Sequence, residues 1–481
     1  MTGSGYPQAL QLQIDGEWIG GEGRERHAVV NPATGETLGE LPLATVGDLD
    51  RALDAADRGF REWRQSDVAV RGNILREVAK LLRERAEAIA PLLTMEQGKP
   101  LAEAKGEVIG AAALFDYFAE EVKRAHGRVL VRPTGSRSIV IKQAVGPVAA
   151  FSPWNFPLFL MARKLAPSLA AGCSIICKPP EETPACAIAL MQCVIDGGVP
   201  GHVAQLVFGE PDVVSRQLIA SPVIRKISFT GSVPVGKHLL KLAADGVKRT
   251  TMELGGHAPV LVFDDCDLER TLDIIVPQKF RNAGQVCVSP TRFYVQSGIY
   301  KRFAEEFTAR TERLTVGNGM NEGTQMGPLA NVRRPEAVSL LIEDAASKGA
   351  RIATGGEHHE EQGGGFFFRP TVLVDVPNDA QIMSTEPFGP VAMMRPFESF
   401  DDAVEEANRL PYGLAAFAFT ENGRQAMRVG DLIESGMVGI NTVGISAVDA
   451  PFGGVKESGH GSEDGPEGLD AYMITKAIHQ A

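Results

Sequence analysis

Three side chains of this sequence have types that could do chemistry together: a thiol, a carboxylate and a rigid amide. Cys287 lies in GQVCVSP, in an expected loop where a thiol can reach a substrate, although an isolated cysteine is more often a buried apolar residue. Glu253 precedes two glycines in ELGG and could be a buried base with a raised pKa, or a carboxylate satisfied by turn amides. Asn155 stands between the prolines of PWNFP, which fix the backbone, and a rigid amide suits an oxyanion hole.

Two other motifs follow strand-like runs and could hold a nucleotide. Lys178 and Glu181 of KPPEETP could bind ribose hydroxyls, or they could form an ion pair in a solvated turn. The FTGS segment, residues 229–232, precedes a helix-like stretch, so its backbone amides could face a phosphate, or it is a plain turn. Both motifs stand where strands are expected to end, and ligands of open α/β sheets bind beyond the carboxyl ends of the strands.

Residues 231–237 also match the first part of the P-loop pattern GxxxxGK[ST], which would make the chain a nucleoside triphosphatase. The match then fails, because His238 stands where a Ser or Thr must bind magnesium and Pro234 removes a backbone amide. The sequence therefore disfavours a P-loop.

The elements that must position these motifs alternate between strand-like and helix-like segments. Residues 46–125 carry apolar residues at helical spacing and predict several helices. Short apolar runs then end in Gly, Pro or polar residues, with helix-like segments between most of them, which predicts an α/β fold with a mainly parallel sheet. A second α/β block follows. Its expected helices lie near residues 267–282 and 299–314, and its expected strands near Phe293, Val372 and Ala416.

Two segments raise questions of location and assembly. Residues 143–162 carry no formal charge over a length that could span a membrane, but Pro147, Pro153 and Pro157 would each break a helix, so we expect a buried loop there. The last strand-like run, residues 472–478, could pair with the sheet edge of another subunit.

The composition limits the classes of function. A chain of 481 residues allows two or three domains. Its 48 basic and 60 acidic residues give a net charge of −12, which disfavours nucleic acid and anionic membrane surfaces as partners. The six cysteines lack CxxC spacing and the adjacent His358 and His359 match no common ligand template, so we expect neither a disulfide framework nor a metal site. The start of the chain, from Met1 through Tyr6 to the strand-like run Leu10 to Ile14, lacks a basic region followed by an apolar region, so we expect no signal peptide and a cytoplasmic location.

Taken in order, the motifs resemble those of the aldehyde dehydrogenase superfamily over nearly the whole chain. The set comprises PWNFP at 153, KPPEETP at 178, FTGS at 229, ELGG at 253, FRNAGQVC ending at 287, EPFGP at 386 and PFGGVKESG at 451. The resemblance implies a Rossmann-type NAD-binding domain (1–122 and 142–253), an α/β catalytic domain (254–446) and a return segment (447–459). It also implies a β oligomerisation region (123–141 and 460–481) that joins subunits into homodimers or homotetramers.

The resemblance also implies roles for individual residues. Cys287 would be the nucleophile, Asn155 with the Cys287 amide the oxyanion hole, and Glu253 the base that activates the deacylating water, so that an aldehyde becomes a carboxylate through a thioester. NAD would be preferred over NADP, because Glu181 would repel a 2′-phosphate. The residues that would bind NAD are Phe151, Trp154, Lys178, Glu181, Gly209, Phe229, Gly231, Ser232, Leu254, Glu386 and Phe388.

For the substrate, the chain resembles semialdehyde dehydrogenases of dicarboxylic pathways. Arg163, Arg281 and Ser446 match that group's carboxylate-binding positions, and the expected substrate is succinic semialdehyde. An alternative is that Arg163 pairs with a carboxylate at a helix end and Arg281 is a solvated charge at a helix C-terminus. The segments GGHAPV, QVCVSPTRF and SEDGPEGLDAY also resemble the 2-oxoglutarate semialdehyde dehydrogenases. Glutaric semialdehyde, or a broad range of aldehydes, stays open as well.

Overall fold

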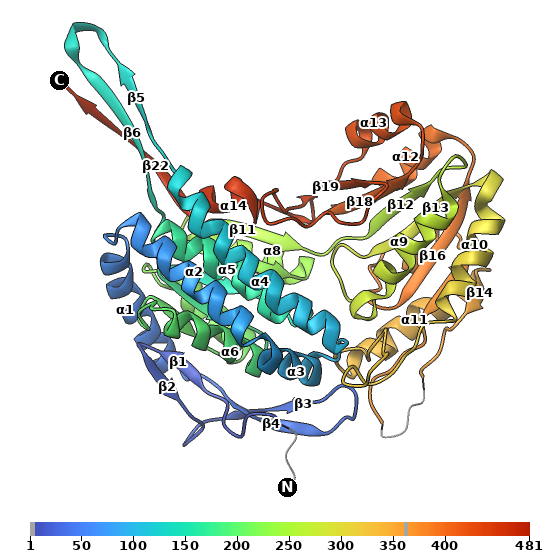
Figure 1. The fold of residues 1–481 in the computed structure, drawn as a ribbon, viewed down its shortest axis with the longest axis horizontal. Helices are drawn as coiled ribbons and strands as arrows, with labels where there is room; N and C mark the ends of the chain where they lie inside the picture. Colours follow the sequence, from blue (N-terminus) through green and yellow to red (C-terminus); the bar gives the residue numbers. More distant parts are fainter. Residues whose placement is uncertain (1–4, 360–363) are drawn as a thin grey trace.

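Two large β-sheets, each with its own hydrophobic core, form the body of the protein (Figure 1). The computed structural model describes residues 5–359 and 364–481, so part of the segment on which the signal-peptide expectation rests lies outside the described residues. The first sheet has the strand order β2-β1-β9-β8-β7-β10-β11-β21 and the second the order β14-β15-β16-β13-β12-β18-β19. The expected α/β architecture is confirmed.

The first sheet is parallel through its centre. Its inner strands β9 (Ala204–Leu206), β8 (Ile175–Lys178), β7 (Val148–Phe151), β10 (Lys226–Gly231) and β11 (Arg249–Leu254) run in one direction. The edges are antiparallel, with β1 (Leu12–Ile14) and β2 (Glu17–Ile19) on one side and β21 (Gly459–His460) on the other. Phe151 pairs with Lys178 on β8 and with Phe229 on β10, so the carboxyl ends of these three strands lie side by side.

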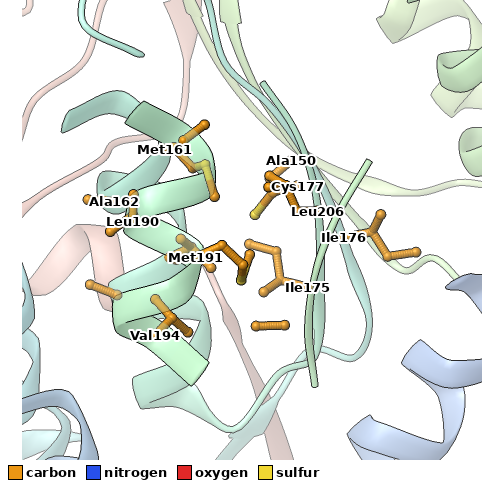
Figure 2. Packing of buried hydrophobic residues seen from close by; sticks show 14 of the residues in the cluster. Ala150, Met161, Ala162, Ile175, Ile176, Cys177, Leu190, Met191, Val194 and Leu206 are labelled. Carbon is orange, nitrogen blue, oxygen red and sulfur yellow. The ribbon is translucent and has the colours of Figure 1, made fainter. Parts of the chain in front are cut away.

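Helices cover the first sheet. Figure 2 shows Met161 of α5 (Pro157–Ala171) and Leu190, Met191 and Val194 of α6 (Pro184–Asp196) gathered beside the strands, where Ile175 points toward the helices. The expected helical stretch at 46–125 consists of α1 (Val46–Trp63), α2 (Val68–Glu84), α3 (Ala86–Gln97) and α4 (Leu101–Glu121). Two shorter crossovers, α7 (Pro211–Ala220) and α8 (Val233–Asp245), lead into β10 and β11.

The second sheet is also mainly parallel and is also covered by helices. Its strands are β12 (Ala258–Val262), β13 (Pro290–Gln296), β14 (Arg351–Thr354), β15 (Thr371–Val374), β16 (Val391–Phe397), β18 (Ala415–Phe419) and β19 (Met437–Ile440), and of these only β14 pairs antiparallel. Its helices are α9 (Leu268–Phe280), α10 (Ser297–Thr311), α11 (Arg333–Ser347), α12 (Phe400–Asn408) and α13 (Gly423–Leu432). The expected helices and strands of this block are therefore present.

A three-stranded arm projects from the body (Figure 1). It joins the hairpin β5 (Arg128–Val131) and β6 (Arg137–Ala144) to the C-terminal strand β22 (Met473–Gln480). The earlier part of the expected region 460–481 lies elsewhere: His460 pairs with Met252 on β11, and α14 (Gly465–Asp470) packs against α4 and α5. Two small pairs complete the fold, β3 (Arg26–Val30) with β4 (Thr37–Pro42) and β17 (Tyr412–Gly413) with β20 (Val455–Lys456).

The expectation of a buried loop over residues 143–162 was wrong. This segment contains strand β7 and the first turns of helix α5. Pro157 occupies the first turn of α5, where a missing N–H costs no hydrogen bond, so it starts the helix rather than breaking it. Glu107 Oε1 accepts from the free amides of Leu158 and Phe159, at 3.0 and 3.1 Å. Across the two described stretches of chain, no helix combines the length and apolar character needed to cross a membrane.

Candidate active site

Cys287 lies in a tightly held turn between α9 and β13. Residues 282–284 all adopt left-handed conformations, with φ of 49°, 52° and 69°, which reverses the chain just after the helix. The side chain of Gln285 fastens this turn, because Nε2 donates to the Asn282 carbonyl and Oε1 accepts from the Ala330 amide, each at 3.0 Å. The turn therefore presents the half-buried Cys287 side chain in a fixed position.

Asn155 is fixed against the same turn. Its Nδ2 donates to the Gln285 carbonyl at 3.0 Å. Its own carbonyl accepts from Lys99 Nζ at 2.8 Å and from Asn282 Nδ2 at 2.9 Å. Lys99 is fully buried and forms an ion pair with Glu107 at 2.5 Å, the same carboxylate that accepts from the first amides of α5. A buried pair that is also hydrogen-bonded holds its geometry well.

Glu253 lies at the carboxyl end of β11 and is buried. Within the part of the chain that the structure describes, neither of its carboxyl oxygens has a hydrogen-bond partner. Burial raises the pKa of Glu253 well above its ordinary value; the neighbouring Glu463 raises it further, while Lys164 and Arg163 oppose the shift. Lys164 is itself paired, donating to Glu463 at 2.5 Å.

One cavity of about 480 Å³ brings these groups together, a size typical of a small-molecule site. Cys287, Glu253 and Asn155 all line it. Burial raises the pKa of the Cys287 thiol to about 12, and the charges of Glu386 and Glu253 act in the same direction. Six of the expected cofactor residues also line the cavity: Trp154, Gly231, Ser232, Leu254, Glu386 and Phe388.

The other expected cofactor residues lie at the carboxyl edge of the first sheet. Phe151, Lys178 and Phe229 are in register at the ends of β7, β8 and β10. Lys178 Nζ donates to Glu181 Oε2 at 2.6 Å, and the Gly209 amide donates to Glu181 Oε1 at 3.0 Å, so this carboxylate is held from both sides.

The cavity also suits close approach of a nucleotide. A Cβ at Gly231 would lie 2.4 Å from the ring of Phe229, so a larger residue there would require that buried ring to move. Arg334, which lines the cavity, has its buried Nε without a hydrogen-bond partner among the described residues, and such an atom fits a polar ligand. The residues present therefore fit a dinucleotide cofactor.

The loop that carries Glu386 is held from α11. Arg334 donates to the carbonyls of Pro387 and Phe388. Phe388 has a φ of 42°, and its ring meets that of Trp154 edge to face, with centroids 5.5 Å apart. Burial raises the pKa of Glu386 to about 8, whereas Arg334 opposes the shift.

The partial P-loop match has a different structure from a phosphate-binding loop. Helix α8 begins at Val233 with Pro234 in its first turn, and the exposed Lys237 donates to Glu457 at 2.7 Å. A P-loop lysine would be directed to phosphates instead.

The three residues expected to bind a carboxylate occupy two places. Arg163 is buried, with Nη2 donating to Ser446 Oγ at 3.0 Å and forming an ion pair with Asp464 at 2.6 Å. Arg281 is exposed at the C-terminal end of α9, with its guanidinium 5.1 Å from the ring centre of Phe156. Arg163 and Ser446 are therefore in direct contact, and among the described residues Arg281 forms no hydrogen bond or ion pair with either of them.

Residues 18–478 match the model of the aldehyde dehydrogenase family. The chain belongs to the aldehyde dehydrogenase family. It is 51% identical to 4-(hydroxymethyl)benzenesulfonate dehydrogenase of Comamonas testosteroni over 98% of both chains. It is also 43% identical to NADP⁺-dependent succinate-semialdehyde dehydrogenase of Escherichia coli K12, over 97% of this chain and 96% of that one.

Among solved structures, succinate-semialdehyde dehydrogenase from Burkholderia pseudomallei matches with a TM-score of 0.96 and 42% identity, over 99% of this chain and 98% of that one. These matches confirm the expected family and fold. The protein is therefore an oxidoreductase enzyme of a family that uses NAD or NADP.

Several residues that shape the site were not found from the sequence. Lys99, Glu107 and Gln285 hold Asn155 and the Cys287 turn, but each is far in sequence from its partner or looks like an ordinary polar residue. Asp464 lies in SEDGPEGLDAY, a segment that was singled out only for its resemblance to known dehydrogenases. The only sequence feature that marks Asp464 is its acidic side chain between glycine-rich segments.

Proposed function

We propose that this chain oxidises an aldehyde to a carboxylate with NAD, through a thioester on Cys287. The observation that carries the proposal is the single cavity lined by Cys287, Asn155 and Glu253 together with six expected cofactor residues. A thiol, a rigid amide and a buried carboxylate are the groups that acyl transfer through a covalent intermediate requires.

Each of the three residues would act at a different point of the reaction. Asn155 Nδ2 and the Cys287 amide would stabilise the alkoxide that forms when the sulfur attacks the carbonyl carbon. NAD held by the cofactor residues would supply the acceptor for the hydride that leaves this carbon, and a positive charge that favours the thiolate of Cys287. Glu253 would then take a proton from the water that cleaves the thioester, and its raised pKa makes it a stronger base than an ordinary carboxylate.

NAD is our proposed cofactor in preference to NADP. The adenosine ribose hydroxyls would lie against Glu181, which Lys178 and the Gly209 amide hold in place. A 2′-phosphate there would meet a carboxylate that cannot turn away easily, and the like charges would repel each other. The E. coli relative named for NADP⁺ makes this preference a point to be measured.

For the substrate, we propose an aldehyde that carries a negative charge away from its carbonyl group. The exposed cation of Arg281 and the relatives named for succinate semialdehyde support succinic semialdehyde as the first candidate. Glutaric and 2-oxoglutarate semialdehyde have the same kind of charge at a different distance. To bind the carboxylate of any of these three semialdehydes, the site needs a cationic side chain that is not already paired with an acidic residue.

One observation favours a second candidate, an aromatic aldehyde with a sulfonate group. Arg163 is already neutralised by Asp464, so among these two arginines the available cation is Arg281, which lies over the ring of Phe156. An aromatic body could pack against such a surface while its anion reaches Arg281. A relative at 51% identity is named for 4-(hydroxymethyl)benzenesulfonate, and the matching aldehyde is 4-formylbenzenesulfonate.

The function is tested by NADH formation from succinic semialdehyde, 4-formylbenzenesulfonate, butyraldehyde and benzaldehyde. Cys287→Ser should abolish oxidation and leave NAD binding intact, because a serine hydroxyl without a strong base is a much weaker nucleophile. Normal turnover by this variant would refute the thioester mechanism.

The anion site is tested by Arg281→Ala. We expect kcat/KM to fall about ten- to a hundredfold for the anionic aldehydes and little for the uncharged ones, the usual effect of losing a charged hydrogen bond. Arg270→Ala is a matched control, because it removes an exposed positive charge at the other end of α9. Equal losses for charged and uncharged aldehydes would exclude an anion site at Arg281.

We also propose a homodimer or homotetramer in the cytoplasm. The projecting arm exposes Val129 and Val131, at 62% and 89%, and another subunit would cover such an apolar surface. All six cysteines are free, which suits a reducing compartment. The two separate cores support the expected division into a cofactor domain and a catalytic domain.

A further inference from the structure

Asp464 has a backbone conformation that side chains avoid. Its φ of 57° and ψ of 175° lie in a region that is populated almost entirely by glycine. The residue is 1% exposed and stands at the N-terminal end of α14. Such strain persists only where the surrounding structure holds the residue in place, and it is concentrated at functional sites.

The carboxylate of Asp464 forms a buried ion pair with Arg163. Oδ1 accepts from Arg163 Nε at 3.1 Å, and Oδ2 lies 2.6 Å from Nη2, a two-point contact between two buried side chains. The guanidinium is also enclosed, with the rings of Phe159 and Phe452 at 4.6 and 4.1 Å. Asp464 thus offsets the charge of Arg163 and accepts its Nε–H, while Nη2 donates to Ser446.

This ion pair borders the catalytic cavity. Phe452 lines the cavity, and so does Leu160, one helical turn before Arg163 on α5. The charge of Arg163 reaches Cys287, since it opposes the rise in the pKa of that thiol. Arg163 is therefore separated from the substrate space by one aromatic ring.

Unlike Arg163, Arg281 is not neutralised by an ion pair with a described residue. It is exposed, and in the described portion of the chain it forms no hydrogen bond or ion pair. The charge of Arg281 opposes the rise in the pKa of Glu103, but the Glu103 carboxylate accepts from the amide of Asn282 and forms no ion pair with Arg281 among the described residues. Of the two arginines expected to bind a carboxylate, Arg163 is paired with Asp464, and Arg281 has no ion-pair partner among the described residues.

We propose that Asp464 is a specificity-determining residue that withdraws Arg163 from the substrate. The inference rests on the proposed aldehyde oxidation and names the substrate class of that site. With Arg163 neutralised, the one of these two arginines that stays available to a substrate anion is Arg281. Aldehydes whose anion binds at Arg281 are then favoured over aldehydes whose anion needs Arg163.

The experiment compares Asp464→Asn and Asp464→Gly with the wild type. Asn keeps the size and a hydrogen-bond acceptor but removes the charge, and Gly also suits the backbone conformation. We expect the kcat/KM ratio of succinic semialdehyde to 4-formylbenzenesulfonate to rise about tenfold or more in both variants, the usual effect of a charged hydrogen bond gained by one substrate. Butyraldehyde reports any general loss of activity.

Asp375→Gly is the matched control. Asp375 also has a positive φ, of 54°, but it is exposed just beyond β15 and accepts from Tyr300, so its replacement by glycine removes a carboxylate at a positive φ without touching Arg163. The substrate ratio should stay at the wild-type value. A similar rise in this variant would mean that the ratio does not depend on the pair of Asp464 with Arg163, and the proposal would be overturned.

A second readout separates this inference from the proposed function. Calorimetry measures binding of succinate, the product-like anion, to the same proteins without any turnover. Tighter succinate binding in Asp464→Asn, by about tenfold, supports the inference even if no aldehyde is oxidised. Unchanged succinate affinity and an unchanged substrate ratio in an active enzyme overturn the inference and leave aldehyde oxidation standing.

Discussion

Replacing Asn155 by alanine tests whether its amide stabilises the developing alkoxide. The rest of its environment should survive the change. The bonds from Lys99 and Asn282 are made to the backbone carbonyl of Asn155, which alanine retains. Only the bond from Nδ2 to the Gln285 carbonyl is lost.

The two expected effects differ greatly in size. Loss of one hydrogen bond of this kind costs about 1 kcal/mol of folding stability. Loss of an oxyanion donor costs about 2.7–4 kcal/mol in the transition state, which corresponds to roughly a hundred- to a thousandfold lower kcat. Because the donor acts on charge that is absent from the bound aldehyde, KM should change little.

The assay is steady-state NADH formation, with thermal unfolding and the rate of Cys287 alkylation as checks on the fold. Asn408→Ala is the control, since Asn408 Nδ2 also donates to a backbone carbonyl, that of Leu432 at 2.8 Å, and its Oδ1 accepts from the Glu434 amide at 2.8 Å. It should lose at least as much stability as Asn155→Ala and keep its kcat. If Asn155→Ala lowers kcat by less than about tenfold, the oxyanion role is wrong.

Other substitutions test the base, the cofactor site and a buried acid. Glu253→Gln should give a burst of NADH about equal to the enzyme sites and then little turnover, measured by stopped flow; equal loss of both phases would place Glu253 in the first step. Glu181→Ser should lower the ratio of kcat/KM with NAD to kcat/KM with NADP. An unchanged ratio would contradict the proposal that Glu181, held by Lys178, disfavours the 2′-phosphate of NADP. Burial raises the pKa of Glu96 to about 7 from an ordinary 4.5, although Tyr6 donates to it. The folded state therefore binds more protons than the unfolded state between these values, and stability falls as the pH rises through that range; Glu96→Gln should make the fall shallower in unfolding titrations.

The sequence motifs predicted which residues line the cavity. They did not predict the residues that hold these side chains in position. Cys287, Glu253 and Asn155 stand at strand ends or in loops, and parallel strands bring such positions to one edge. Local sequence patterns are enough to predict such positions. They do not identify Lys99 and Gln285, because the hydrogen-bond partners of these two residues are remote in sequence.

Pro157 shows the limit of a local rule. The rule makes this proline a helix breaker, yet in the first turn of α5 it has no hydrogen bond to break. The deciding fact is that Glu107, on another helix, accepts from the amides that follow. Sequence spacing cannot show that acceptor.

The charges around Glu253 link substrate choice to the strength of the base. Two adjacent cations on α5, Arg163 and Lys164, pair with two adjacent anions, Asp464 and Glu463. All four act on Glu253: the cations lower its pKa and the anions raise it. Removing the charge of Asp464 would therefore free Arg163 for a substrate anion and also weaken Glu253 as a base. A change that improves binding of a short semialdehyde should slow the cleavage of its thioester, so the two properties cannot be adjusted independently at this site.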